Sequence, residues 1–196
     1  MKNIALEMEQ TKRPLAVNPK KFALWLFIVS IVMIFAAMTS AYIVRRADGN
    51  WIDFTIPAVF YFTTVIIILS SITMQWAYYS AKKDNLQPLK IALLLTTVLG
   101  IVFLLGQYMG WEDLQNQNVF FGGAESNPGG SFFYILTGLH GFHLITGIIF
   151  LVIVLIGAFR YKIHSKNLVL IEMCTTYWHF LDFLWVYLFF FLLLNH

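Results

Sequence analysis

The chain has 196 residues, of which 59% are hydrophobic and 12% are charged. This composition excludes a soluble globular domain. The formal net charge is +3, but no basic run carries the interleaved aromatic residues of a nucleic-acid-binding module. Five apolar runs reach the ~20 residues that a helix needs to cross a bilayer, and they lie at 22–44, 57–81, 89–108, 132–159 and 168–194. Because lipid satisfies no backbone hydrogen bonds, these runs predict an all-α integral membrane protein, a bundle of five transmembrane helices.

The positive charges predict how this bundle is oriented. All but two of the 13 Lys and Arg residues lie in the N-terminal segment, in the second connection or in the fourth connection. The two exceptions are Arg45 and Arg46, in the first connection. Lys and Arg accumulate on the cytoplasmic side, so residues 1–21 form a cytoplasmic segment and the transmembrane domain covers 22–196. The C-terminus is predicted to be periplasmic. The first run is too long for a signal peptide and is interpreted as an uncleaved anchor.

The longest connection, 109–131, is acidic and rich in turn-forming residues. It holds Glu112, Asp113 and Glu125 and ends in Ser-Asn-Pro-Gly-Gly. We expect a solvated loop on the outer face, with a docking loop as the alternative. The other connections are shorter and make successive helices antiparallel neighbours.

The last apolar run carries three ionisable side chains, Glu172, His179 and Asp182. A charged group at the centre of a membrane helix costs at least about 2.5–3.5 kcal/mol, so such residues face protein or a wet cavity. Glu172 and His179 are seven residues apart and share a helix face, and Asp182 lies roughly 60° further round. This helix is therefore predicted to pack against protein along that arc. Glu172, near the cytoplasmic end, is expected to be partly hydrated and paired with the basic residues of the fourth connection.

The fourth run holds His140 and His143 within a surface of small residues that allows close helix contact. A rise of ~1.5 Å per residue places His143 at nearly the same depth as Asp182. We therefore predict a buried polar network that ties the fourth helix to the fifth through a His143–Asp182 contact. His140, Glu172 and His179 belong to it, and the indole N–H of Trp178 is expected to help satisfy the interior.

Other readings of these residues stay open. His140 or His143 could bind a haem together with His179. Alternatively, His140 and His143 together with a carboxylate could bind a single metal ion. Glu172, His179 and Asp182 could relay protons. Structural hydrogen bonding is the favoured interpretation. No nucleophile–base pair and no phosphate-binding loop occurs in the sequence, so we assign no catalytic residue, no metal ligand and no cofactor to this chain.

Two stretches carry a resemblance to a known family. Residues 133–143 read FYILTGLHGFH, and residues 177–185, which follow Glu172, read YWHFLDFLW. Shorter matches are LSSIT at 69–73, Gly106-Gln107 with Trp111, and Ala41-Tyr42 with Arg45. Together they resemble subunit III of the haem–copper oxidases, the cytochrome c oxidase and quinol oxidase family, in its five-helix bacterial form.

The resemblance implies a non-redox subunit in the bacterial cytoplasmic (inner) membrane. Its implied partners are the catalytic subunit I, subunit II and membrane phospholipid, with haem and copper in the partner subunits. The implied roles are proton uptake, sustained turnover and assembly of an oxygen-reducing, proton-pumping complex. Two family glutamates are replaced here: Ile31 follows Ser30, and Gly110 precedes Trp111. The alternatives are an accessory subunit of a nitric oxide reductase, a haem b-binding membrane anchor and a small ion-coupled transporter.

Overall fold

The computed structural model describes residues 18–47, 49, 51, 54–123, 126–160 and 168–195. In these ranges the chain forms five helices: α2 (Pro19–Ala47), α3 (Ala58–Lys82), α4 (Leu86–Asn116), α5 (Pro128–Phe159) and α6 (Val169–Asn195). Each of the five is long and apolar enough to cross a membrane. The predicted all-α bundle of five long apolar helices is thus confirmed.

The predicted loop at 109–131 is wrong at both of its ends. α4 continues to Asn116 because its last turns are packed: Leu114 is fully buried. α5 begins at Pro128, where the Asn127 side chain accepts a hydrogen bond of 2.7 Å from the Gly129 amide. An Asn cap followed by Pro in the first turn is a strong start signal for a helix. Glu112 and Asp113 therefore belong to α4, and Glu125 lies outside the described residues.

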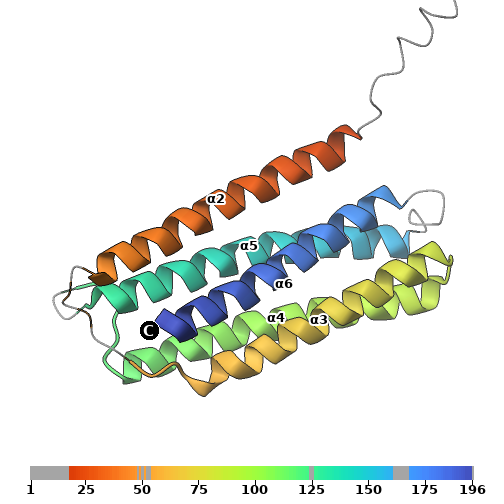
Figure 1. Cartoon of the computed structure of the whole chain (residues 1–196). Coiled ribbons are helices and arrows are strands. Elements are labelled where there is room, and N and C mark those ends of the chain that lie inside the picture. Colours follow the sequence, from red (N-terminus) through yellow and green to blue (C-terminus); the bar gives the residue numbers. More distant parts are fainter. Residues whose placement is uncertain are drawn as a thin grey trace, which may run out of the picture.

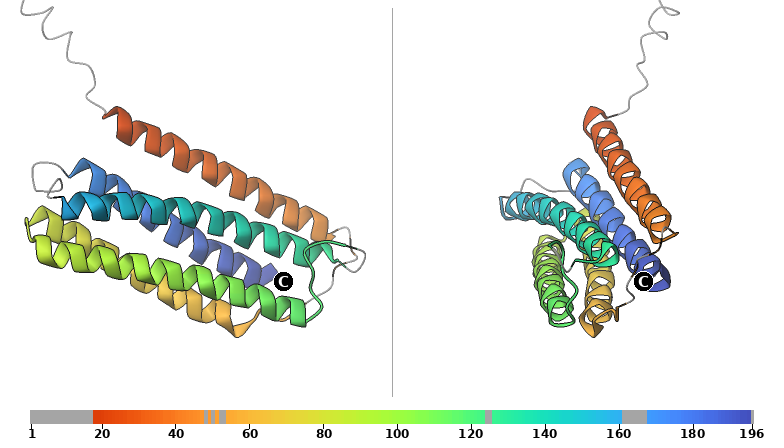
Figure 2. Two further views of the ribbon diagram at one scale, coloured as in Figure 1. Left: turned by 180° about the vertical axis from the view of Figure 1, so that it is seen from behind. Right: turned by 90° about the vertical axis from the view of Figure 1, so that its left-hand side faces the viewer.

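The helices form a bundle in which α6 is central and α2 is peripheral (Figures 1 and 2). α3 and α4 form an antiparallel hairpin with the most extensive contact between any two helices. α6 packs against both α3 and α5, and α2 lies across α5 and α6. In the most apolar 18-residue segment of α6, 50% of the residues are buried inside the protein. In the corresponding segment of α2, only 22% are buried.

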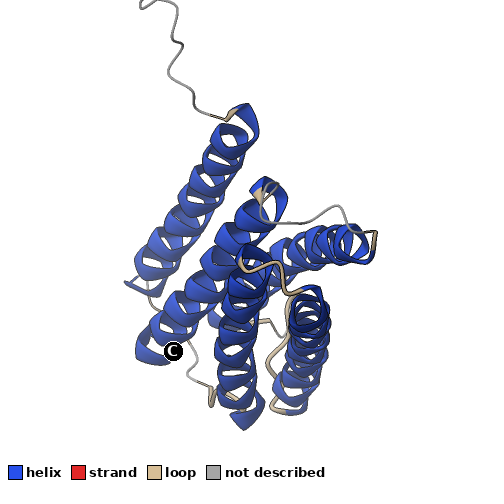
Figure 3. Ribbon diagram, turned by 90° about the vertical axis from the view of Figure 1, so that its right-hand side faces the viewer, coloured by secondary structure: helices blue, strands red, loops and turns tan. Residues whose placement is uncertain are grey.

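α2 contacts the bundle through one narrow stripe. Its buried residues are Ile28, Ile31, Phe35, Thr39 and Tyr42, at three- and four-residue spacing on one helix face. The remaining faces of α2 expose large apolar side chains. Figure 3 shows this helix at the edge of the bundle. At the far end, the Tyr42 hydroxyl donates a 2.7 Å hydrogen bond to the Asn195 carbonyl of α6.

Several glycines allow close helix contacts, among them Gly100 of α4, where a Cβ would lie 2.8 Å from the Trp178 ring of α6. A Cβ atom at Gly106 would lie 2.3 Å from Thr63 of α3, and one at Gly110 would lie 2.6 Å from the Phe60 ring. A Cβ at Gly147 would lie 2.9 Å from Leu181 of α6. By contrast, a Cβ at Gly138 or Gly141 would make ordinary contacts with α4, so the small-residue surface of α5 is tight only where it meets α6.

Candidate functional site: the polar seam between α3 and α6

Polar side chains face one another along most of the contact between α3 and α6. We call this row the polar seam. Because the two helices are antiparallel, residue numbers rise along α3 as they fall along α6. The seam consists of Thr64, Ser70, Ser71, Gln75 and Tyr78 on α3 and Trp185, Asp182, His179, Trp178 and Glu172 on α6.

Two tryptophans of α6 contribute hydrogen bonds to the seam. The Trp185 indole N–H donates to the Thr64 hydroxyl over 3.0 Å, and the Trp178 indole N–H donates to the Ser70 hydroxyl over 3.1 Å. Both rings are almost completely buried. Each indole therefore supplies a large apolar surface to the core while its single donor is satisfied on the neighbouring helix. Trp178 was expected to help satisfy the interior, and its partner is Ser70.

His179 is bound at both ring nitrogens by α3. Its Nδ1 lies 2.6 Å from the Ser71 hydroxyl, and its Nε2 lies 3.0 Å from Oε1 of Gln75. Ser71 and Gln75 are four residues apart and occupy successive turns of one helix face. The half-buried imidazole is thus held between two turns of α3. At this point the polar face of α6 is hydrogen-bonded to α3.

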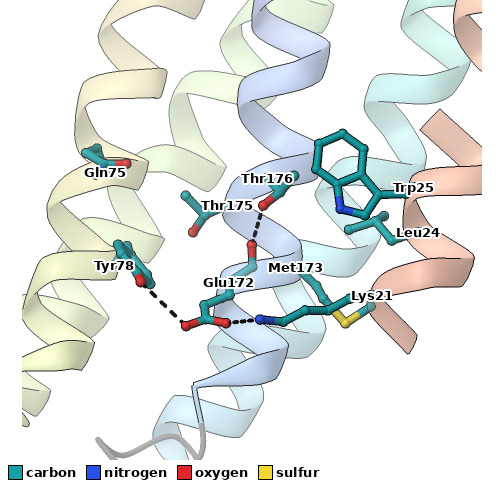
Figure 4. A pocket seen from close by; sticks show the side chains of 9 residues that line it. All are labelled: Lys21, Leu24, Trp25, Gln75, Tyr78, Glu172, Met173, Thr175 and Thr176. Carbon is teal, nitrogen blue, oxygen red and sulfur yellow. Dashed lines mark hydrogen bonds and ion pairs between the residues drawn. The ribbon is translucent and has the colours of Figure 1, made fainter. Parts of the chain in front are cut away.

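The seam opens into a cavity at the end where α6 begins. Glu172 forms an ion pair with Lys21 of α2 at 2.5 Å and accepts a 3.5 Å hydrogen bond from the Tyr78 hydroxyl. Around them lies a cavity of about 360 Å³ between α2, α3 and α6, lined also by Trp25, Gln75, Thr175 and Thr176 (Figure 4). We call it the Lys21 pocket. Glu172 is paired as expected, but its partner is Lys21; Lys162 and Lys166 lie outside the described residues.

Asp182 is the least satisfied member of the seam. It is 4% exposed, and among the described residues neither of its carboxyl oxygens has a hydrogen-bond partner. The predicted His143–Asp182 hydrogen bond is not formed. Instead, the His143 Nδ1 bonds the Leu139 carbonyl of its own helix at 2.8 Å.

Among the described residues, the side chains of the two α5 histidines form no hydrogen bond with the polar seam. His140 is fully buried next to the rings of Phe103 and Trp185, and within the described residues neither of its ring nitrogens has a hydrogen-bond partner. His143 packs against Phe35 of α2. α5 and α6 are linked through Tyr177, whose hydroxyl lies 2.8 Å from the Thr146 hydroxyl and donates to the His143 carbonyl over 3.4 Å.

Ile31 and Gly110, the two positions at which the resemblance led us to expect glutamate, are both closely packed. Ile31 is 1% exposed and belongs to the stripe by which α2 contacts the bundle. Gly110 leaves room for the Phe60 ring. The neighbouring Trp111 donates from its indole N–H to the Thr137 hydroxyl of α5 over 3.1 Å. Ile31 and Gly110 therefore serve close packing in this chain.

The seam is suited to hydrogen bonding between α3 and α6. In the part of the chain that the structure describes, no three His, Cys, Asp or Glu side chains are grouped closely enough to hold a metal ion. The groups available are an imidazole bonded to a hydroxyl and an amide, a buried carboxyl without a hydrogen-bond partner among the described residues, and an ion pair at one end.

The sequence reasoning missed the α3 half of the site. It grouped His179 and Asp182 with the α5 histidines, whereas Ser71, Gln75 and Tyr78 supply the contacts. A signal was present: Ser70, Ser71 and Gln75 are polar residues within an apolar run that crosses the membrane. Polar side chains in such a run are expected to find partners on another helix.

Comparison with known proteins identifies the family. The family model of cytochrome c oxidase subunit III matches residues 6–195. The chain belongs to this family. The subunit 3 of the cytochrome bo(3) ubiquinol oxidase of Buchnera aphidicola is 31% identical over 91% of this chain and 95% of its own length. A probable cytochrome c oxidase subunit 3 of Nocardia farcinica is 30% identical over 84% of this chain and 82% of its own length. The rat cytochrome c oxidase subunit 3 is 30% identical over 90% of this chain and 69% of its own length.

The family assignment confirms the resemblance seen in the sequence. Its two long motifs occupy the middle of the subunit III fold: FYILTGLHGFH forms the first half of α5, and YWHFLDFLW forms the middle of α6. Relatives with bacterial sources cover most of the chain, and they include oxidases named for ubiquinol and for cytochrome c.

Proposed function

We propose that this chain is the non-redox third subunit of a respiratory haem–copper oxidase in the cytoplasmic membrane of a bacterium. In that complex it packs against subunit I and subunit II, which carry the haem and copper. It supports assembly, proton uptake and sustained turnover of the oxygen-reducing complex. The observation that carries the proposal is the family match, which extends over nearly the whole chain.

The distribution of charge supports an orientation with the N-terminus in the cytoplasm. Lys20 and Lys21 begin α2, Lys82 and Lys90 flank the turn from α3 to α4, and Arg160 follows α5. These ends of the helices lie at one end of the bundle (Figure 1). By the positive-inside rule this end is cytoplasmic. The Lys21 pocket then opens at the cytoplasmic headgroup level, where phospholipid can reach the Lys21–Glu172 pair.

The polar seam has a role in assembly under this proposal. Membrane helices gain little from hydrophobic association, so packing and interhelical hydrogen bonds determine how firmly two helices are held. The seam joins α3 to α6 by several such bonds, and α6 in turn contacts α5. The seam therefore keeps the bundle in one arrangement, which gives subunit I a fixed surface to bind.

The test is an affinity pull-down of this protein from membranes extracted in mild detergent, followed by an optical spectrum of the eluate. A haem–copper oxidase spectrum together with a large co-purifying subunit supports the proposal and identifies the haem types. A colourless protein without partners overturns it. A reporter enzyme that is active only in the periplasm tests the orientation when it is fused to the C-terminus. The fusion should be active if the C-terminus is periplasmic and inactive if it is cytoplasmic.

A further inference from the structure

A groove lies between the end of α2 and the beginning of α5. The two helix segments lie side by side at one end of the bundle (Figure 1). The groove has a volume of about 670 Å³, within the range of about 300–1,000 Å³ that is usual for small-ligand sites. Ala37, Ser40, Ala41 and Arg45 of α2 line one side of it, and Phe132 and Ile135 of α5 line the other. We call it the Arg45 groove.

Small side chains on α2 make room for this groove. Ala37 and Ala41 are one turn apart on the same face of the helix, and both are exposed. The next turn towards the middle of the membrane carries Met33, which is 67% exposed and does not line the groove. The groove therefore follows α2 from Ala37 to Arg45, a rise of about 12 Å.

A positive charge lies at the outer end of the groove. Arg45 is the only charged side chain among the lining residues. A guanidinium keeps its charge and offers several N–H donors, and one of them bonds the Gly49 carbonyl at 3.4 Å. α2 has 29 residues, so it is about 43 Å long and reaches through both headgroup layers of a bilayer. Because α2 ends at Ala47, Arg45 lies at headgroup level.

Ser40 supplies a hydroxyl deeper in the groove. It lies about 7.5 Å further into the membrane than Arg45, close to the thickness of one headgroup layer, about 5–8 Å. The Ser40 side chain is exposed and forms no hydrogen bond with a described residue. By contrast, the hydroxyl of Ser30 on the same helix donates to the Phe27 carbonyl over 2.7 Å. The Ser40 hydroxyl is therefore available to a ligand.

We propose that the Arg45 groove binds one phospholipid molecule, with its phosphodiester at Arg45. An ester carbonyl of the lipid accepts a hydrogen bond from Ser40, and the first part of one acyl chain lies over Ala37 and Ala41. Cation, hydroxyl and apolar surface follow one another in the same order as phosphate, ester and chain. A transmembrane helix of a partner is a poorer fit, because it would follow α2 for about 30 Å, whereas the groove ends after about 12 Å.

This site is separate from the Lys21 pocket, which lies at the opposite end of α2. Under the proposed orientation the Lys21 pocket faces the inner leaflet and the Arg45 groove faces the outer leaflet. The inference goes beyond the proposed role in an oxidase, since it requires only that the chain spans a membrane.

Photocrosslinking in lipid nanodiscs tests the proposal. The protein is purified with its partners and placed in nanodiscs of phosphatidylglycerol that carries a photoreactive group on the first carbons of an acyl chain. After illumination, mass spectrometry of peptides locates the label, which should lie within 37–45 and 128–135 in the wild type. Ala41→Leu fills the groove and Arg45→Gln removes the cation, and each should lower this labelling about fivefold.

Two matched controls change neighbouring residues outside the groove. Ala36→Leu adds the same side chain as Ala41→Leu, but Ala36 lines a different cavity, between α2 and α6. Arg46→Gln removes the other cation in the last turn of α2, which does not line the groove. Both variants should be labelled like the wild type. Ser40→Ala, which removes only the hydroxyl, should lower the labelling less than Arg45→Gln does.

Equal labelling of the wild type, Ala41→Leu and Arg45→Gln would overturn the proposal, because the labelled lipid would then belong to the general bilayer around the protein. The proposal would also fail if the wild type carried no label in these two segments, since another subunit would then cover the groove. Neither failure bears on membership of the oxidase complex, which the pull-down tests separately.

Discussion

α5 and α6 both carry histidines in apolar helices long enough to cross a membrane, but the surroundings of these histidines differ. His179 on α6 has a partner at each ring nitrogen, both supplied by α3. His140 on α5 is enclosed by aromatic rings, 5.9 Å from Phe103 and 5.1 Å from Trp185 between ring centroids, and within the described residues it has no hydrogen-bond partner. Burial of a histidine in a membrane helix is therefore not evidence of a polar network by itself. The side chains on the facing helix decide what the histidine contributes.

The largest expected effect is that of His179→Phe. The substitution keeps a ring but removes two hydrogen bonds and leaves Ser71 and Gln75 without their partners. An unsatisfied buried polar group costs about 1–3 kcal/mol, and the cost is lower for partly buried groups such as Ser71 and Gln75. We expect the amount of assembled oxidase per cell to fall several-fold, while the initial turnover of the complex that does assemble changes less. Haem content of the purified complex and its early oxygen consumption measure the two quantities.

His179→Gln serves as the control for this prediction. It can still reach Ser71 and Gln75 and should restore most of the assembly. Normal assembly of His179→Phe with turnover abolished would show that His179 has a direct functional role rather than a structural one.

Trp185→Phe is expected to have an intermediate effect. The change retains an aromatic ring between α3, α4 and α5 but removes the hydrogen bond of 3.0 Å to Thr64. Interhelical hydrogen bonds in membranes contribute about 0.6 kcal/mol on average, and the smaller ring adds a packing loss. We expect the solubilised complex to lose subunit III at a lower temperature than the wild type, as followed by native gels after heating.

Tyr187→Phe is a useful comparison for Trp185→Phe. It also removes one side-chain hydrogen bond of α6, the contact of 3.4 Å to Thr39 of α2, but this bond is long and partly exposed. If both variants behaved alike, the polar seam would contribute no more than an ordinary contact at the edge of the bundle.

His140→Phe should behave in the opposite way to His179→Phe. No hydrogen bond of the described structure is lost, and an imidazole that is buried without partners is replaced by an apolar ring. The desolvation cost of His140 is removed, and a small overpacking cost is added. We expect assembly and thermal retention of subunit III to be equal to the wild type or slightly higher. A several-fold loss would mean that His140 has a polar partner after all, such as a bound water.

The sequence predicted the helices and the polar arc of α6 but not the partner of that arc. Hydropathy and length place five spans, and the seven-residue spacing places Glu172 and His179 on one face. Periodicity, however, shows which residues of a helix face protein and not which helix they meet. Ser71 and His179 are separated by 108 residues in the chain. Equal depth made His143 a reasonable partner for Asp182, but the rotation of α5 directs His143 toward Phe35 of α2 instead.

The apolar pattern of the sequence also failed to predict where the helices end. α4 continues past the apolar run because Trp111 bonds Thr137 and Leu114 is buried, which are tertiary contacts. The pairing of Glu172 with Lys21 likewise depends on where α2 lies, and the apolar stripe of α2 does not specify its neighbour. Local composition thus determined the elements, and the contacts between distant segments determined the site.

Lys21→Met is expected to have the smallest effect, and it defines the limit of the polar seam. The Lys21 and Glu172 side chains are 43% and 29% exposed, and exposed ion pairs contribute about 0–1 kcal/mol because water and salt screen them. α2 also stays attached through its apolar stripe and through Tyr42. Assembly and thermal retention of the Lys21→Met variant should therefore match the wild type within error, at both low and high salt. A marked loss at low salt, absent in the charge-retaining control Lys21→Arg, would place this ion pair among the contacts that hold α2 on the bundle.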